Sequence, residues 1–153
     1  PGFFLRAQMS NKAIMLVLGY GGLVPFFAFC MGAWWLTDWP AALSRQGFII
    51  YSLGILSFLG GTLWGRVQGV ENPNMTRLLV SNGVVLFGVF SVLTAQVWLA
   101  ALALMTGYLA LLWYERGSEV LPGWYTTMRY RLTAGVVSAH LLFFMLQSYH
   151  SAS

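Results

Sequence analysis

The side chains best suited to acid–base or metal chemistry are scarce in this sequence. Among 153 residues there are two His, one Cys and four Asp or Glu. His140 stands inside an apolar stretch, where we expect a neutral ring hydrogen-bonded to a neighbouring helix. Its candidate partners are Ser57, Thr62 and Asn82. A ligand or quinone contact and haem ligation are the other interpretations of this ring.

Motifs that usually accompany catalysis do not occur. The sequence has no Gly-rich phosphate loop, no Cys-x-x-Cys pair and no His-Glu-x-x-His motif. Cys30 has no basic neighbour, so we expect an inert buried thiol. The basic residues are scattered, which disfavours nucleic-acid binding. We therefore expect neither an enzyme nor a protein with a bound metal or cofactor.

The most polar segment precedes the last apolar run. Arg129 and Arg131 are two residues apart at a helix start, so their side chains should point to different sides. We expect one to pair with Glu115 or Glu119 and the other to meet a lipid phosphate. Together with Arg66 they form a candidate contact site for an anionic lipid, although membrane topology alone also accounts for these charges.

The composition of the chain indicates which kind of fold holds these side chains. Hydrophobic residues make up 58% of the chain and charged residues only 8%, whereas a soluble domain carries about 25% charged residues. Twelve charges cannot coat a protein of this size, so lipid must contact most of its surface. A soluble enzyme, a coiled coil and a disordered chain are all excluded.

Five apolar runs are long enough to cross the hydrocarbon core as helices, which takes about 20 residues each. The predicted spans are residues 13–36, 47–65, 78–95, 97–114 and 132–149. Thr94–Gln96 is the only polar break between the third and fourth spans, so a tight hairpin is expected there. The predicted fold is all-α, a single integral membrane domain over residues 1–153 with a bundle of five transmembrane helices.

The basic residues also predict an orientation. With five spans, seven of the eight Lys and Arg residues fall on one side and Arg45 alone on the other. The positive-inside rule places the N-terminus in the cytoplasm and the C-terminus in the periplasm. Residues 1–8 precede Met9, and they are expected to be either a non-native or extended N-terminus or a short interfacial anchor.

Small residues predict where helices pack, because helices associate in lipid through close backbone approach. Ser57, Gly61, Gly65 and Gly69 recur every four residues, which aligns them on one face as a packing seam. Pro25 lies near the middle of the first span and should kink it. Local unwinding there, as in transporter binding sites, is the less favoured interpretation.

Three segments carry a family resemblance: Gly19–Phe26; Tyr51–Ser52 with Leu56–Gly61 and Trp64–Gly65; and Pro122–Tyr125 with Met128–Arg129 and Leu132–Thr133. They resemble the signatures of the bacterial domain-of-unknown-function family 3429, whose eukaryotic relative is transmembrane protein 69. The resemblance implies a small protein of the bacterial inner membrane with mitochondrial relatives and no established activity.

For function, we expect an accessory or assembly subunit of a larger membrane complex, plausibly an energy-transducing one. Its partners would be membrane lipids and other membrane subunits, without nucleic acid. A small oligomeric transporter or channel is the first alternative. A lipid- or quinone-binding protein is the second, and an elongated apolar cleft with Arg129 or Arg131 at its mouth would identify it.

Overall fold

The structure, a computed structural model, describes residues 2–66, 75–94, 96–118 and 123–152. In this part of the chain all regular elements are helices. They are α1 (Gly2–Gly21), α2 (Val24–Trp35), α3 (Asp38–Arg66), α4 (Met75–Thr94), α5 (Val97–Ser118) and α6 (Gly123–Ala152). The prediction of an all-α fold is confirmed, and α1 includes most of the segment 1–8 that the sequence left open.

Four stretches of the described helices are long and apolar enough to cross a membrane. They are Lys12–Trp35, Asp38–Leu63, Met75–Leu93 and Val97–Gly117. They overlap the first four predicted spans, so the chain is a membrane protein. The fifth predicted span, which falls in α6, is not among them.

Two predicted spans begin too late. The second was placed from Gly47, but α3 already begins at Asp38. Asp38 has a φ of 56°, a left-handed conformation that Asp tolerates. Pro40 lies in the first turn, where its missing N–H costs nothing, and its carbonyl accepts a hydrogen bond from Ser44 Oγ at 2.9 Å. Likewise α6 begins at Gly123, nine residues before the predicted start of the last span.

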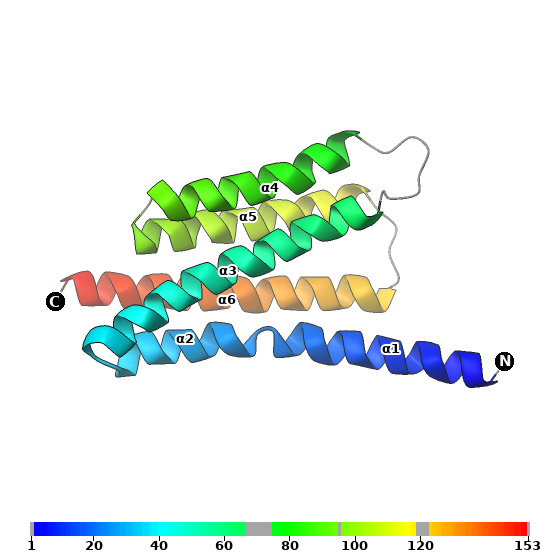
Figure 1. Ribbon diagram of the computed structural model, residues 1–153, viewed down its shortest axis with the longest axis horizontal. Coiled ribbons are helices and arrows are strands. Elements are labelled where there is room, and N and C mark those ends of the chain that lie inside the picture. Colours follow the sequence, from blue (N-terminus) through cyan, green and yellow to red (C-terminus); the bar gives the residue numbers. More distant parts are fainter. Residues whose placement is uncertain (1, 67–74, 95, 119–122, 153) are drawn as a thin grey trace.

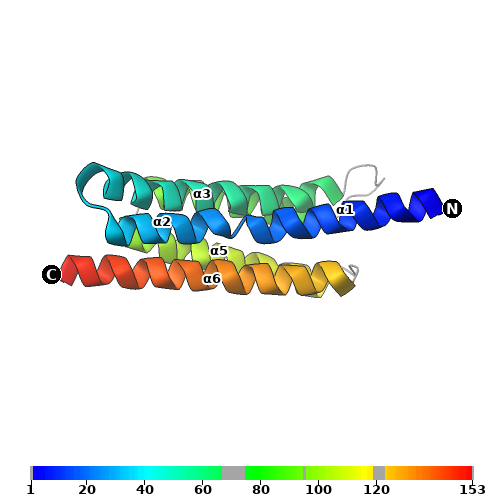
Figure 2. The same cartoon turned by 90° about the horizontal axis from the view of Figure 1, so that it is seen from below.

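The helices run roughly side by side, and α1 and α2 follow one another along one edge of the bundle (Figure 1). α6 lies next to them, and α3 crosses the bundle obliquely to pack against α2, α4 and α5. The view from below places α3 and α6 on opposite sides of α1 and α2 (Figure 2). α4 ends at Thr94 and α5 begins at Val97, which confirms the predicted hairpin.

Aromatic and aliphatic side chains fill the centre of the bundle. Phe48 of α3 stacks on Phe143 of α6, with ring centroids 4.2 Å apart and an interplanar angle of 1°. Phe26, Leu56 and Tyr108 bring α2, α3 and α5 to the same core, and each is at most 1% exposed. This core holds the polar side chains of α3, α5 and α6 in place.

The predicted kink at Pro25 is a full break in the helix. α1 ends at Gly21, α2 begins at Val24, and Pro25 occupies the first turn of α2. The amide of Gly22 still donates to the carbonyl of Leu18 at 3.0 Å, so the two helices continue in nearly the same direction. Because a proline needs no N–H partner in a first turn, the break costs little.

Candidate functional site

An elongated cavity of about 440 Å³ lies between α1, α2, α3 and α6, with Tyr108 of α5 at its floor. Its lining residues recur at steps of three and four, from Met15 to Phe26, from Tyr51 to Thr62 and from Tyr125 to Val136. Each stretch covers eleven residue steps, which is about 16 Å along a helix. The cavity therefore runs parallel to the helices, and most of the side chains that line it are apolar.

One side of this cavity is open. Leu18 of α1 and Phe58 of α3 both line it, and they are 70% and 69% exposed. Phe26 and Tyr108, which also line the cavity, are 1% exposed. The cavity is therefore open between α1 and α3, on the outer surface of the bundle.

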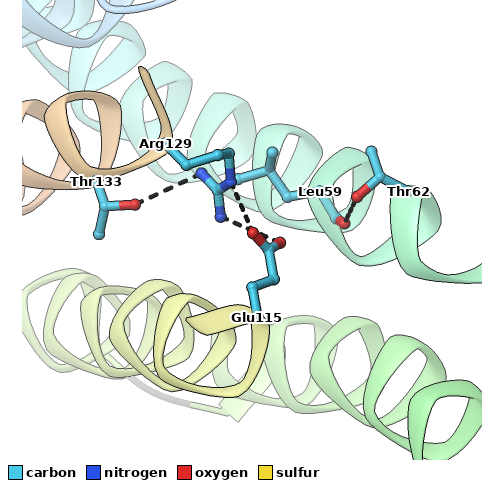
Figure 3. A network of polar contacts seen from close by, with 5 residues as sticks. All are labelled: Leu59, Thr62, Glu115, Arg129 and Thr133. Atoms are coloured by element: carbon cyan, nitrogen blue, oxygen red, sulfur yellow. Dashed lines mark hydrogen bonds and ion pairs between the residues drawn. The ribbon is translucent and has the colours of Figure 1, made fainter. Parts of the chain in front are cut away.

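A buried ion pair lies beside the cavity, about one helical turn from the Tyr125 end of its lining on α6. Figure 3 shows this pair. Arg129 of α6 lines the cavity, and its Nε and Nη2 donate to the two carboxylate oxygens of Glu115 in α5 at 3.0 and 3.3 Å. Its Nη1 donates to Thr133 Oγ1 at 3.5 Å. The Arg129 and Glu115 side chains are 4% and 3% exposed. A fork of two parallel hydrogen bonds fixes the guanidinium plane as well as its charge.

The expected pairing of one arginine with Glu115 is thus confirmed, but the expected environment is wrong in two respects. Arg129 was a candidate for lipid phosphate, whereas it is buried against a carboxylate. Glu115 falls just outside the predicted fourth span, 97–114, whereas it lies inside α5, which continues to Ser118. Arg131 is exposed and remains a candidate for lipid contact. The side chain of Arg66 lies outside the described residues.

His140 is 1% exposed and hydrogen-bonded through both ring nitrogens. Nδ1 lies 2.7 Å from the carbonyl oxygen of Val136, and Nε2 lies 2.6 Å from Ser52 Oγ. A carbonyl can only accept, so Nδ1 carries the proton and Nε2 of the neutral ring accepts from Ser52. With both nitrogens engaged, the ring presents no free ligand atom.

The predicted bond from His140 to a neighbouring helix is therefore present, but the three predicted partners are wrong. Ser52 lies on the α3 face that points into the core and is fully buried. Its carbonyl also accepts a hydrogen bond from Tyr108 at 2.7 Å. Ser52 thereby connects α3 with both α5 and α6. Asn82, by contrast, is exposed on α4 and donates to the carbonyl of Leu78 in its own helix at 2.9 Å.

Within this chain, no helix packs closely against the described glycines of the predicted seam on α3. Gly61 and Gly65 are exposed, and a Cβ added at either would meet nothing within 4 Å. Ser57 is only half-buried, and Gly69 lies outside the described residues. The close approach is made one position earlier, at Gly60, where an added Cβ would lie 3.1 Å from the carbonyl oxygen of Ser81 in α4.

Ser81 completes that contact by donating from Oγ to the carbonyl of Gly60 at 2.6 Å. The four-residue repeat of small side chains correctly predicted that these residues share one face of α3. It did not predict what lies against that face. The neighbouring Gly60 and the polar Ser81 on α4 were the available signal, because a small residue facing a hydroxyl permits an interhelical hydrogen bond.

Sequence reasoning also missed the stripe of polar side chains along α6. Tyr125, Arg129 and Thr133 recur every four residues and all line the cavity. This spacing places them on one helix face. The pattern was visible in the sequence, but the predicted start of the last span at residue 132 separated Thr133 from the other two.

Together, the fold and the cavity define a helical membrane protein with an open-sided, mostly apolar pocket that has a buried ion pair beside it. Residues 11–145 match DUF3429, a family described as a protein of unknown function. The chain belongs to this family, as the resemblance indicated. Comparison with curated proteins gave no match, and comparison with solved structures gave none either. The expected link to transmembrane protein 69 stays a prediction.

Proposed function

We propose that this protein binds a lipid-soluble molecule in the cavity, taking it up from within the membrane. The observation that carries this proposal is the elongated apolar cavity that opens toward lipid between Leu18 and Phe58. Its 440 Å³ lies within the range of about 300–1,000 Å³ that is usual for small-molecule sites. A single tail or a ring with a tail suits its long, narrow form.

The proposal includes the five-span topology. α6 packs against α5 and α2 in the same layer of the bundle, so it occupies the depth of the bilayer that its neighbours cross. Its 30 residues correspond to about 45 Å, more than the hydrocarbon thickness of about 30 Å. Its polar residues Arg129, Thr133 and His140 are buried inside the bundle, where they avoid lipid.

The orientation follows from the same arrangement. The start of α4, the end of α5 and the start of α6 lie at the end of the bundle opposite the C-terminus (Figure 1). Arg77, Arg116 and Arg131 belong to these segments, and Lys12 Nζ lies 5.3 Å from the ring centroid of Trp124 at the start of α6. Arg45 belongs to the first part of α3, toward the other end. The positive-inside rule puts the first end in the cytoplasm of a bacterium. The cavity's ion pair then faces the cytoplasmic half of the inner membrane.

A binding protein suits these observations better than the two other expected functions. A transporter of polar solutes needs a hydrated path, whereas most of the cavity lining is apolar. The role of accessory or assembly subunit stays a prediction, because it depends on a partner chain. Copurification from native membranes in mild detergent tests it directly, since a subunit should bring its complex with it.

Photolabelling tests the binding proposal. The purified protein in lipid nanodiscs would be irradiated with dodecyl diazirine, an alkyl probe without a head group, and the labelled peptides mapped by mass spectrometry. We expect labels to concentrate on the cavity lining of α1, α3 and α6. Labels spread evenly over the exposed faces of all helices would refute the proposal.

A matched pair of variants sharpens the result. Ile55 lines the cavity and is half-buried, whereas Ile50 lies on the same helix, is 56% exposed and does not line the cavity. Ile55→Trp should reduce labelling of the lining on α6, and Ile50→Trp should leave it unchanged. Equal labelling in both variants would show that the probe does not enter the cavity.

A further inference from the structure

Some hydrogen-bond donors in the cavity lining already have an acceptor within the chain, and others do not. Three hydroxyl groups are already donated to backbone carbonyls: Tyr51 to Gly22 at 2.9 Å, Tyr108 to Ser52 at 2.7 Å and Thr62 to Leu59 at 2.6 Å. These groups have no proton left for a ligand. Along most of its length the cavity therefore offers a bound molecule apolar contact and no free hydroxyl proton.

Donors remain at the end that holds the ion pair. A guanidinium carries five N–H groups. Arg129 donates two to Glu115 and one to Thr133, which leaves two without an acceptor in the described part of the chain. The hydroxyls of Tyr125 and Thr133, one helical turn to either side, donate no hydrogen bond to any described residue. All of these spare donors lie on one stripe of α6.

In the described part of the chain, Arg129 already has a counter-charge. Glu115 neutralises Arg129 through two hydrogen bonds, and both side chains are at most 4% exposed. An anion placed here would meet a nearby carboxylate and lose its hydration without a net positive partner. A neutral oxygen acceptor gains hydrogen bonds from a charged donor and brings no charge that needs compensation.

We propose that the cavity takes a neutral, single-tailed molecule whose carbonyl-type oxygen accepts hydrogen bonds from Arg129, between Tyr125 and Thr133, while its tail extends toward Phe26. This inference rests on the proposed function and specifies the ligand class of the same site. A quinone ring and the carbonyl of a ketone or ester lipid share this chemistry.

Competition against the photolabel separates these possibilities. Four compounds of similar tail length would compete with dodecyl diazirine for the cavity: tridecan-2-one, decyl-1,4-benzoquinone, dodecyl phosphate and dodecane. We expect at least one of the two carbonyl compounds to compete about tenfold more strongly than dodecyl phosphate and dodecane, the gain expected for one hydrogen bond from a charged donor. The ranking of the two carbonyl compounds then identifies the source, ring or open chain.

Two variants test where the head group lies. Tyr125→Phe removes one spare donor without changing the ring, and we expect it to weaken competition by the preferred carbonyl compound about threefold while leaving dodecane unchanged. Tyr130→Phe, on an exposed position of the same helix that does not line the cavity, is the control. Glu115→Gln uncovers the arginine charge and should shift the preference toward dodecyl phosphate.

The outcomes are distinguishable. A cavity that the diazirine never labels refutes the proposed function itself. A labelled cavity at which dodecane competes as well as the carbonyl compounds, or at which dodecyl phosphate competes best, keeps the proposed function and overturns the inference. A Tyr125→Phe protein with an undiminished preference for the carbonyl compound overturns it as well. The compound ranking on the unchanged protein and the Tyr125→Phe result stand even if Glu115→Gln fails to fold.

Discussion

Replacing Glu115 with Gln tests how much the buried ion pair contributes to the fold. The substitution keeps the side-chain volume but leaves the Arg129 guanidinium, 4% exposed, without its counter-charge. Two unit charges about 4 Å apart attract by about 4 kcal/mol at an effective dielectric constant of about 20. Removing one partner of a buried pair costs about 3–5 kcal/mol. We expect Glu115→Gln to lower the free energy of unfolding by that amount.

The double variant Glu115→Gln/Arg129→Met tests whether the loss of stability comes from the unpaired charge of Arg129. Since it buries no charge, we expect it to recover most of the lost stability. The assay is reversible unfolding in mixed detergent micelles with increasing SDS, followed by circular dichroism. A single Glu115→Gln variant within about 1 kcal/mol of the unchanged protein would contradict this reasoning, because exposed pairs are worth no more than that. A double variant less stable than the single one would contradict it too.

The same unfolding assay checks three further predictions. His140→Leu should destabilise the protein by about 1–3 kcal/mol because it leaves the Ser52 hydroxyl buried without its partner, and adding Ser52→Ala should recover part of that loss. Gly60→Ala should cost about 1–3 kcal/mol by forcing α3 away from the α4 backbone, while Gly61→Ala, in open space, should be neutral or slightly stabilising. Asn82→Leu should change stability by less than about 0.5 kcal/mol, because this exposed amide bonds only within its own helix; a larger loss would indicate an interhelical role.

Hydropathy was enough to predict the helical class, the first four spans and the hairpin after Thr94. These features depend on runs of apolar residues, which an average of hydropathy over a sequence window detects. The starts of the helices were harder to predict, because the charged or polar residues before an apolar run were assigned to loops. Pro40 lies at the start of α3 because the first turn of a helix accepts proline. Arg129 lies inside α6 because the buried carboxylate of Glu115 compensates its charge.

The candidate site was only partly predictable for a different reason. Periodicity says which residues share a helix face, but not which helix that face meets. Gly61 and Gly65 do share a face, yet Gly60 makes the close contact. His140 does bond to another helix, yet the partner is Ser52. Which helix a residue contacts depends on the order of the helices around the bundle and on the rotation of each helix about its own axis. Both are decided by the packing between pairs of helices.

α6 differs from the other helices in where its polar residues lie. It is the least hydrophobic of the six helices. Arg129, Thr133 and His140 contribute to that, and all three are at most 3% exposed. Hydropathy averages over every face of a helix, whereas lipid meets only the outer one. A helix that lines the cavity and anchors the core must carry its polar groups inward, so the low hydropathy of α6 reflects side chains that lie against the cavity and the core.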